Sequence, residues 1–279
     1  MKTVLTIAAL TLREAARRRV VLAVAALTLV LLLVSGWGFS RLAAQEMTSG
    51  ETRLTASIVL NLVMFGFSLI AALGTAFLAG PTIAGETESG IALAVLARPV
   101  RRTEVLLGKW LGLVAFGTGF VVIAGLAQCL VVRWTVDYWP PSPATALGLL
   151  SLQTVVLLTL ALLLSTAVSP MASGVVAVGL FGATWIAGVV GGIGASLGNE
   201  SVERVGVISR VLLPTDGLWR GAMRAFQDPS ALVEFGGSDA SAFPFLSISG
   251  LTGSYLVWAL VWIGMVFGLA ALSFVRRDL

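Results

Sequence analysis

The sequence predicts an all-α integral membrane protein with six transmembrane helices. The chain of 279 residues is 57% hydrophobic and only 11% charged, and its uncharged runs exceed the roughly 20 residues that a helix needs to cross a bilayer. A β-barrel would instead alternate apolar and polar residues in segments of about 10 residues, and no such alternation is present. We therefore expect a single helical membrane domain over residues 1–279.

Six apolar runs define the expected spans. The uncharged stretch between Tyr138 and Asn199 is too long for one crossing. Ser169-Pro170 divides it, because the residue before a proline avoids the α region. The spans are expected at residues 20–40, 56–80, 103–132, 144–168, 171–197 and 251–275. An even number of spans puts both termini on the same side of the membrane.

Lys and Arg gather on one side of this arrangement, and the positive-inside rule makes that side the cytoplasm. We therefore expect a multi-pass protein of the plasma membrane with both termini and the loops at 81–103 and 169–170 in the cytoplasm. The basic residues of the cytoplasmic side are Lys2, Arg13, Arg17, Arg18, Arg19, Arg98, Arg101, Arg102, Lys109, Arg276 and Arg277. The other side has Arg41, Arg53, Arg133, Arg204, Arg210, Arg220 and Arg224.

Residues 2–19 are expected to form an amphipathic helix on the inner membrane face. Leu5, Ala8, Leu12 and Ala15 recur at helical spacing, with arginines on another side of the helix. The apolar run after ARRR is about twice as long as a typical signal-peptide core, so we expect it to remain as the first span. Alternatively, residues 2–19 are a positive flank that only sets the topology.

Missing residue types exclude several chemistries. The chain has no histidine, which is the usual general base and the commonest metal ligand. Its single cysteine, Cys129, lies within an apolar span. Gly108-Lys109 lacks the upstream glycine of a phosphate-binding loop and is followed by Trp110. We expect no catalytic site, no metal site, no cofactor bound by this chain and no nucleic-acid partner.

A short cytoplasmic helix is expected at residues 84–98, AGETESGIALAVLAR, between the second and third spans. Pro81 and Gly85 weaken helix continuity after the second span. Pro99 ends the new helix because it disfavours the α conformation of the residue before it. Thr103 then provides an N-cap for the third span.

The charges and apolar residues of this short helix suit a protein partner. Glu86 and Glu88 at its start and Arg98 near its end complement the helix dipole. Ile91 and Val95 lie four residues apart, so apolar side chains cover much of the helix and part of it can fill a groove in a partner. The alternative is a solvated loop whose arginines only hold the topology.

The stretch AGETESGIALAVLARPVRRTEVLLGKWLG resembles the type 2 family of ABC transporter permeases, and the C-terminal FVRRDL resembles the usual ending of that family. The resemblance implies that residues 84–98 are a coupling helix, which inserts into a cleft of a separate cytoplasmic ABC ATPase that binds ATP and Mg. The usual assembly of two permeases with two ATPases implies a second copy of this chain. The residues that match the start and end of the coupling motif are Glu86, Glu88, Gly90, Pro99, Arg101 and Arg102.

Residues 198–250 are the longest polar segment and are expected outside the cell membrane. Helical spacing of apolar residues predicts two short amphipathic helices at the outer surface, separated by a proline and followed by a loop at 227–250. The stretch LLPTDGLWR resembles a segment of family members that serve nitrous-oxide reductase maturation. One interpretation of this segment is that it lies at the membrane interface and only caps the spans. The other interpretation is a functional site. The candidate residues of an extracytoplasmic gate, or of a docking site for an outside partner, are Pro214, Asp216, Trp219 and Arg220.

Strongly charged residues are nearly absent from the spans, which amides and hydroxyls interrupt, whereas an ion-coupled transporter would need an intramembrane Asp, Glu or His. An ion-coupled transporter is therefore ranked third, after the two functions given below. Gly108-x-x-x-Gly112 and Gly188-x-x-x-Gly192 are expected to let helices approach closely. The polar residues expected to form hydrogen bonds between helices are Asn61, Gln128, Gln153 and Thr184.

Two functions follow from these observations. The first is a permease subunit of an ATP-driven ABC exporter, without a nucleotide site of its own. The second is a non-transporting membrane scaffold or assembly factor that recruits an extracytoplasmic partner. The apolar spans permit a lipid, a peptide or a hydrophobic drug as substrate, and the absence of histidine argues against direct passage of a soft metal.

Overall fold

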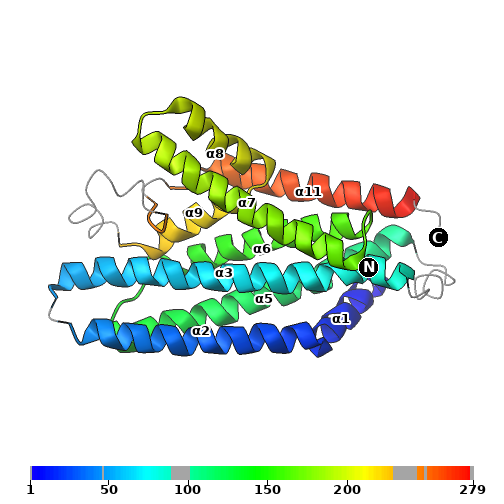
Figure 1. Cartoon of the computed structure of the whole chain (residues 1–279). Coiled ribbons are helices and arrows are strands. Elements are labelled where there is room, and N and C mark those ends of the chain that lie inside the picture. The colour runs from blue at the N-terminus through cyan, green and yellow to red at the C-terminus, as the bar shows by residue number, and fades with distance from the viewer. Residues whose placement is uncertain (1, 46, 89–100, 229–243, 248–249, 277–279) are drawn as a thin grey trace.

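The computed structural model of the chain is a bundle of α-helices (Figure 1) and describes residues 2–45, 47–88, 101–228, 244–247 and 250–276. Within these ranges no strand is formed. The helices are α1 (Lys2–Arg17), α2 (Arg19–Ala43), α3 (Ser49–Glu88), α5 (Arg102–Val136), α6 (Pro143–Ser165), α7 (Pro170–Ser196), α8 (Glu200–Leu212), α9 (Thr215–Phe226) and α11 (Gly253–Arg276).

Six of these helices are long and apolar enough to cross a membrane, namely α2, α3, α5, α6, α7 and α11. The predicted fold class is therefore confirmed. The division of the long apolar stretch is also confirmed, because α6 ends at Ser165 and α7 begins at Pro170 with Ser169 as its N-cap. The beginning of α1 and the end of α11 lie at the same end of the bundle, while α8 and α9 lie toward the other end (Figure 1).

The second span is longer than predicted because α3 continues through Pro81 and Gly85 to Glu88. The expectation of a helix break after the second span was wrong. Proline is tolerated in membrane helices where neighbouring groups compensate the backbone. Next to Pro81, the Lys109 ammonium group of α5 donates a hydrogen bond of 2.8 Å to the Thr82 carbonyl oxygen and so ties α5 to this part of α3.

Tight packing also holds α3 together around the proline. Ile83 is buried in a small cluster with Leu106 of α5 and Phe274 of α11. A Cβ atom at Gly80 would lie 2.5 Å from the Pro170 carbonyl oxygen, so the absence of a side chain there lets α7 begin directly against α3. Three neighbouring helices therefore enclose this part of α3.

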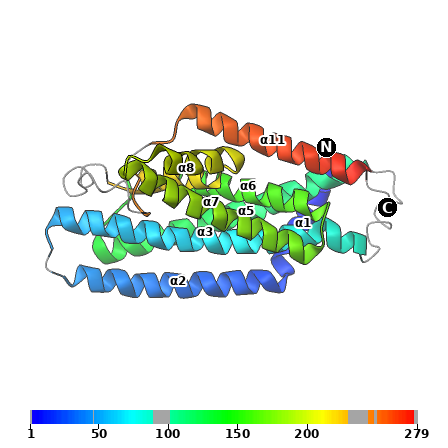
Figure 2. The same ribbon diagram turned by 45° about the horizontal axis from the view of Figure 1, so that its top comes forward.

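The first helix has the predicted extent, with α1 ending at Arg17 and α2 beginning at Arg19. Figure 2 shows α1 turning away from the direction of α2. The close approach predicted for the glycines of α5 is confirmed, and the partner is α1. A Cβ atom at Gly108 would lie 2.7 Å from Cβ of Ile7, and one at Gly112 would lie 2.6 Å from the Ala8 carbonyl oxygen. Whether α1 lies in a membrane interface stays a prediction.

Gln128, Gln153 and Thr184 form hydrogen bonds between helices, as predicted, whereas Asn61 bonds to a segment outside the helices. These bonds join α2 to α5, α3 to α6, α7 to α9 and α3 to the segment before α11. The bonded pairs are Ser35 and Gln128 at 2.8 Å, Ser68 and Gln153 at 3.0 Å, Thr184 and Thr215 at 2.9 Å, and the Asn61 amide with the Phe245 carbonyl oxygen at 3.0 Å.

Candidate functional site

Local sequence signals explain α8 and α9, the short helices in the described residues between α7 and α11. The Asn199 side chain caps α8 by accepting a hydrogen bond of 3.3 Å from the Val202 backbone N–H. Glu200 and Glu203 lie in the first turn of α8, where a negative charge is favourable. Pro214 then separates α8 from α9. The predicted pair of helices is therefore confirmed.

Asp216 is the centre of a charged cluster that joins three helices. Its carboxylate is almost fully buried and accepts from Nε of Arg210 in α8 at 3.1 Å and from Nε of Arg220 in α9 at 3.0 Å. Arg220 also donates through Nη2 to the Gly188 carbonyl oxygen of α7, at 2.6 Å. One carboxylate thus accepts from two guanidinium groups, which leaves the cluster with a net positive charge.

A glycine face on α7 makes room for this cluster. A Cβ atom at Gly188 would overlap the Asp216 carboxylate, and one at Gly191 would lie 2.7 Å from Cα of Gly206 in α8. At Gly194 it would lie 2.7 Å from the Glu203 backbone nitrogen. The prediction of close packing in the fifth span is correct at Gly188, and the contacts continue at every third residue. These glycines pack against α8 and α9 of the same chain.

The C-terminal end of α8 is held by α11, in contacts that the sequence did not predict. The last carbonyl groups of a helix lack intrahelical donors, and here three successive ones receive side-chain donors. The bonds run from Tyr255 OH to Arg210 O at 3.0 Å, from Trp258 Nε1 to Val211 O at 3.1 Å, and from Trp262 Nε1 to Leu212 O at 2.8 Å. The signal that would have found them is the helical spacing of these aromatic donors at the start of the last span.

A cavity of about 240 Å³ adjoins the charged cluster. It lies between α8, α9 and the beginning of α11, and its lining includes Arg210, Arg220, Gly217, Thr252 and Tyr255. Guanidinium, phenol and hydroxyl groups can hold a polar or anionic group by hydrogen bonds. The ion pairs of this region lock α7, α8 and α9 together.

Helix α9 is mostly buried within the chain, which its amphipathic pattern did not predict. Its place at the outer membrane surface stays a prediction. Gly217 faces Tyr255, and Gly221 lies close to Leu149 and Leu251, so the two glycines let α9 enter the bundle. Trp219 is only 1% exposed. Burial of α9 on nearly all sides depends on these close approaches, which apolar periodicity does not reveal.

The candidate gate residues fall into two groups. Asp216 and Arg220 belong to the charged cluster, whereas Pro214 and Trp219 are buried, and Trp219 packs in the apolar core. The Trp219 ring lies 5.5 Å from that of Phe65, and Phe65 in turn lies 4.6 Å from the Trp185 ring. Nε1 of Trp219 has no hydrogen-bond partner in the described part of the chain. The role of all four as a gate stays a prediction.

The predicted coupling segment is only partly described. Glu86 and Glu88 lie at the C-terminal end of α3, instead of at the beginning of a separate helix. Gly90, Ile91, Val95, Arg98 and Pro99 lie outside the described residues.

The other side of the segment begins with Arg101 and Arg102. Arg101 is exposed and forms the N-cap position of α5. Arg102 donates through Nη1 to the Val275 carbonyl oxygen at 3.3 Å, and so connects the start of α5 to the end of α11. Together with the Lys109 bond to α3, this contact links three membrane helices next to the segment.

Six membrane-length helices, an N-terminal helix and two short helices before the last span define a multi-pass membrane protein. The chain belongs to the ABC-2 family of transporter proteins, whose family model matches residues 5–279. The family predicted from the sequence is therefore confirmed.

One relative is the probable ABC transporter permease protein NosY of Pseudomonas aeruginosa, which is 33% identical to this chain over 135 residues. The matched segment covers 45% of this chain and 47% of NosY. The chain therefore spans about half the length of the curated relative that it matches. This likeness agrees with the resemblance of LLPTDGLWR noted in the sequence.

Proposed function

We propose that this chain is the permease subunit of an ATP-driven exporter and that a separate ABC ATPase drives it through residues 84–102. The ATPase would bind ATP and Mg, and two copies of this chain would assemble with two ATPases in the plasma membrane. Both chain termini would lie in the cytoplasm. The mainly apolar spans favour an apolar or amphipathic substrate.

The observation that carries this proposal is the mechanical connection around the segment. Helix α3 continues to Glu88 and α5 begins at Arg102, so a force on the residues between them acts on the ends of two spans. Lys109 joins α5 to α3, and Arg102 joins α5 to α11. A contact can shift a conformational equilibrium only if it differs between the two states. An ATPase that moves this segment would move three connected spans.

We place the extracytoplasmic gate at the other end of the bundle. The Asp216 cluster joins α7, α8 and α9, and α11 holds the last turn of α8. A movement of α3 relative to α7 would reach this cluster through the Phe65, Trp185 and Trp219 rings. The gate residues would then be Pro214, Asp216, Trp219 and Arg220.

Charge reversal tests the coupling proposal. The double variant Glu86→Lys with Glu88→Lys should lose substrate-stimulated ATP hydrolysis in nanodiscs when the protein is combined with an ABC ATPase that co-purifies with the unaltered chain. The matched control is Glu200→Lys with Glu203→Lys, which reverses two exposed charges of α8. If the first variant keeps normal assembly and coupled hydrolysis, the coupling assignment is wrong.

A second candidate function is a non-transporting scaffold that recruits a partner outside the cytoplasm. The exposed charges of α8 favour it, because Glu200, Glu203 and Arg204 all face away from the bundle core. In that case the α8 charge reversals should abolish capture of the partner, whereas the variants at Glu86 and Glu88 should have no effect. The two pairs of variants therefore separate the two functions.

A further inference from the structure

A long apolar groove runs between α1, α2 and α5. It has a volume of about 530 Å³. Thr28 is the only hydroxyl-bearing residue among its described lining residues, and its hydroxyl group donates to the Val24 carbonyl oxygen at 2.7 Å. The groove therefore offers hydrocarbon contacts and no free hydrogen-bonding side chain. Among its lining residues are Leu12, Val21, Leu29, Phe116, Phe120 and Ile123.

Beside the groove, α2 is fastened to α3 and α5. Leu31 and Val24 of α2 fit against Gly66 and Gly74 of α3, where a Cβ atom would lie 2.9 Å from each side chain. Farther along, Ser35 of α2 bonds to Gln128 of α5. Toward the junction with α1, the side of α5 that faces the groove carries small residues such as Ala115 and Gly119, which leave it unfilled.

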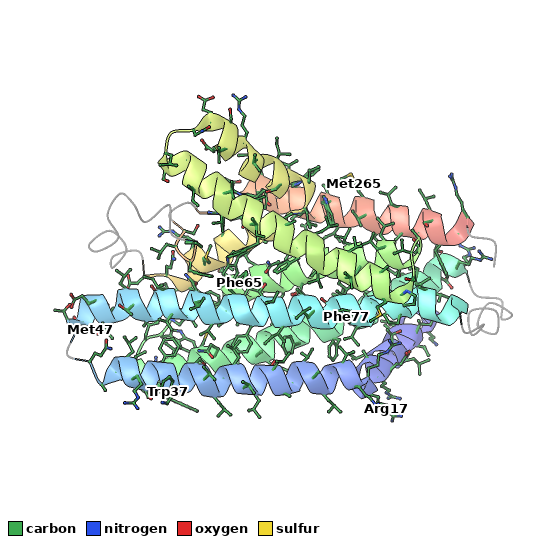
Figure 3. The ribbon with its side chains drawn as sticks, viewed as in Figure 1. Arg17, Trp37, Met47, Phe65, Phe77 and Met265 are labelled. Carbon is green, nitrogen blue, oxygen red and sulfur yellow. The ribbon has the colours of Figure 1, made fainter. Side chains whose placement is uncertain are left out.

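A basic elbow formed by Arg13, Arg17 and Arg19 lies at one end of this groove. Arg13 follows the groove residue Leu12, and Arg17 and Arg19 lie between Leu12 and Val21 in the chain. All three arginines are exposed, and they form no ion pair with the described residues. Figure 3 shows Arg17 at the bend between α1 and α2.

The neighbouring Arg18 differs from the basic elbow because it already has a partner. Its Nη2 atom lies 2.6 Å from the Glu14 carboxylate. Glu14 therefore neutralises Arg18 and leaves the charges of the three elbow arginines uncompensated. Unpaired arginines at the end of an apolar groove suit a phosphate group attached to a hydrocarbon chain.

We propose that the groove holds one acyl chain of an anionic phospholipid, with the lipid phosphate at the basic elbow. The acyl chain would fill the space between α2 and α5, and the phosphate would bind at the junction of α1 and α2. The lipid would thereby fasten α2, which has few buried side chains of its own. This site is independent of the proposed export function, because it concerns binding to the chain alone.

A variant that fills the groove tests the acyl-chain site. Gly119 lines the groove, and a Cβ atom there would meet nothing within 4 Å, so Gly119→Leu places a side chain in the groove from an unobstructed Cβ position. The matched control is Gly264→Leu on α11, at an exposed glycine that also has open space around it. Both full-length variants are purified in detergent, incubated with phosphatidylglycerol, and compared with the unaltered protein by native mass spectrometry.

We expect one phosphatidylglycerol molecule to remain on the unaltered protein and on Gly264→Leu after weakly bound lipid is removed, and to be lost from Gly119→Leu. Equal retention by the two variants, or no retained lipid on the unaltered protein, would overturn the proposal. Loss of a dimer from Gly119→Leu with unchanged lipid retention would assign the groove to a second copy of the chain, which also overturns it.

The headgroup and the site are tested separately. Phosphatidylglycerol should be retained in preference to phosphatidylcholine, and Arg17→Gln or Arg19→Gln should each reduce that preference about fivefold. Equal retention of the two lipids by the unaltered protein would contradict an anionic headgroup.

On the unaltered protein, a photoactivatable group near the end of the acyl chain should label peptides that contain Leu29 or Ile123. Labelling confined to other helices would contradict the groove as the site.

Discussion

Two regions of the bundle use glycine in opposite ways. At the α7, α8 and α9 junction, Gly188 and Gly191 lie directly against a carboxylate and a backbone of the neighbouring helices. Beside α2, in contrast, Gly119 faces open space and lines a groove. Glycine thus brings helices into contact only where a neighbouring helix faces it, and elsewhere the same residue leaves a cavity.

The two regions also differ in how firmly their helices are held. Three side chains of α11 bond to the end of α8, and Asp216 joins two arginines. Only 11% of the residues in the membrane-length part of α2 are buried, compared with 67% in that of α6. Figure 2 shows α2 at the edge of the bundle. Because local stability follows buried contacts, α2 should separate from the bundle more easily than α9.

The largest effect is expected when the charged cluster is broken. Asp216→Asn keeps the size of the side chain but leaves two arginines without a carboxylate. It should destabilise the fold by about 3 kcal/mol, since removing one partner of a buried ion pair leaves uncompensated charge, and partial exposure of both arginines limits the loss. Thermal unfolding in detergent measures it. Asp137→Asn, at an exposed left-handed position that asparagine tolerates, is the control, and equal melting temperatures would contradict the structural role of the cluster.

A smaller effect on stability is expected from alanine in place of a glycine that contacts a helix or of a glycine that lines the groove. Gly188→Ala should destabilise the protein by about 1–3 kcal/mol, because its methyl group would meet the Asp216 carboxylate. Gly119→Ala should be neutral or slightly stabilising, because its methyl group enters open space and alanine favours a helix. Thermal unfolding of the two variants tests the comparison directly. A larger loss from Gly119→Ala than from Gly188→Ala would reverse it.

The smallest effect is expected from one hydrogen bond between α11 and α8. Trp262→Phe removes the donor to the Leu212 carbonyl oxygen and should cost about 1 kcal/mol. Amide hydrogen exchange should then become faster in the last turn of α8 than in the unaltered protein. Trp134→Phe provides the control because Trp134 is 80% exposed. Unchanged exchange in α8 would show that the bond does not hold this helix.

Several features of the fold could be predicted because they depend on residues close together in the sequence. Length and hydropathy located the six spans, Ser169-Pro170 marked the turn between α6 and α7, and Pro214 separated α8 from α9. Single polar residues in apolar spans also indicated hydrogen bonds between elements, since a polar group in hydrocarbon needs a partner. The individual partners could not be read from the sequence.

The sequence by itself thus determined the class of protein, the number of spans and the residues that need polar partners. Only the tertiary structure decided that α3 continues past Pro81, that α9 is buried, and that Arg210 and Arg220 meet at Asp216. It also decided which glycines contact a helix and which line a groove. The physical reason is that these outcomes depend on contacts between distant parts of the chain, where the shape of a neighbouring helix overrides local preference.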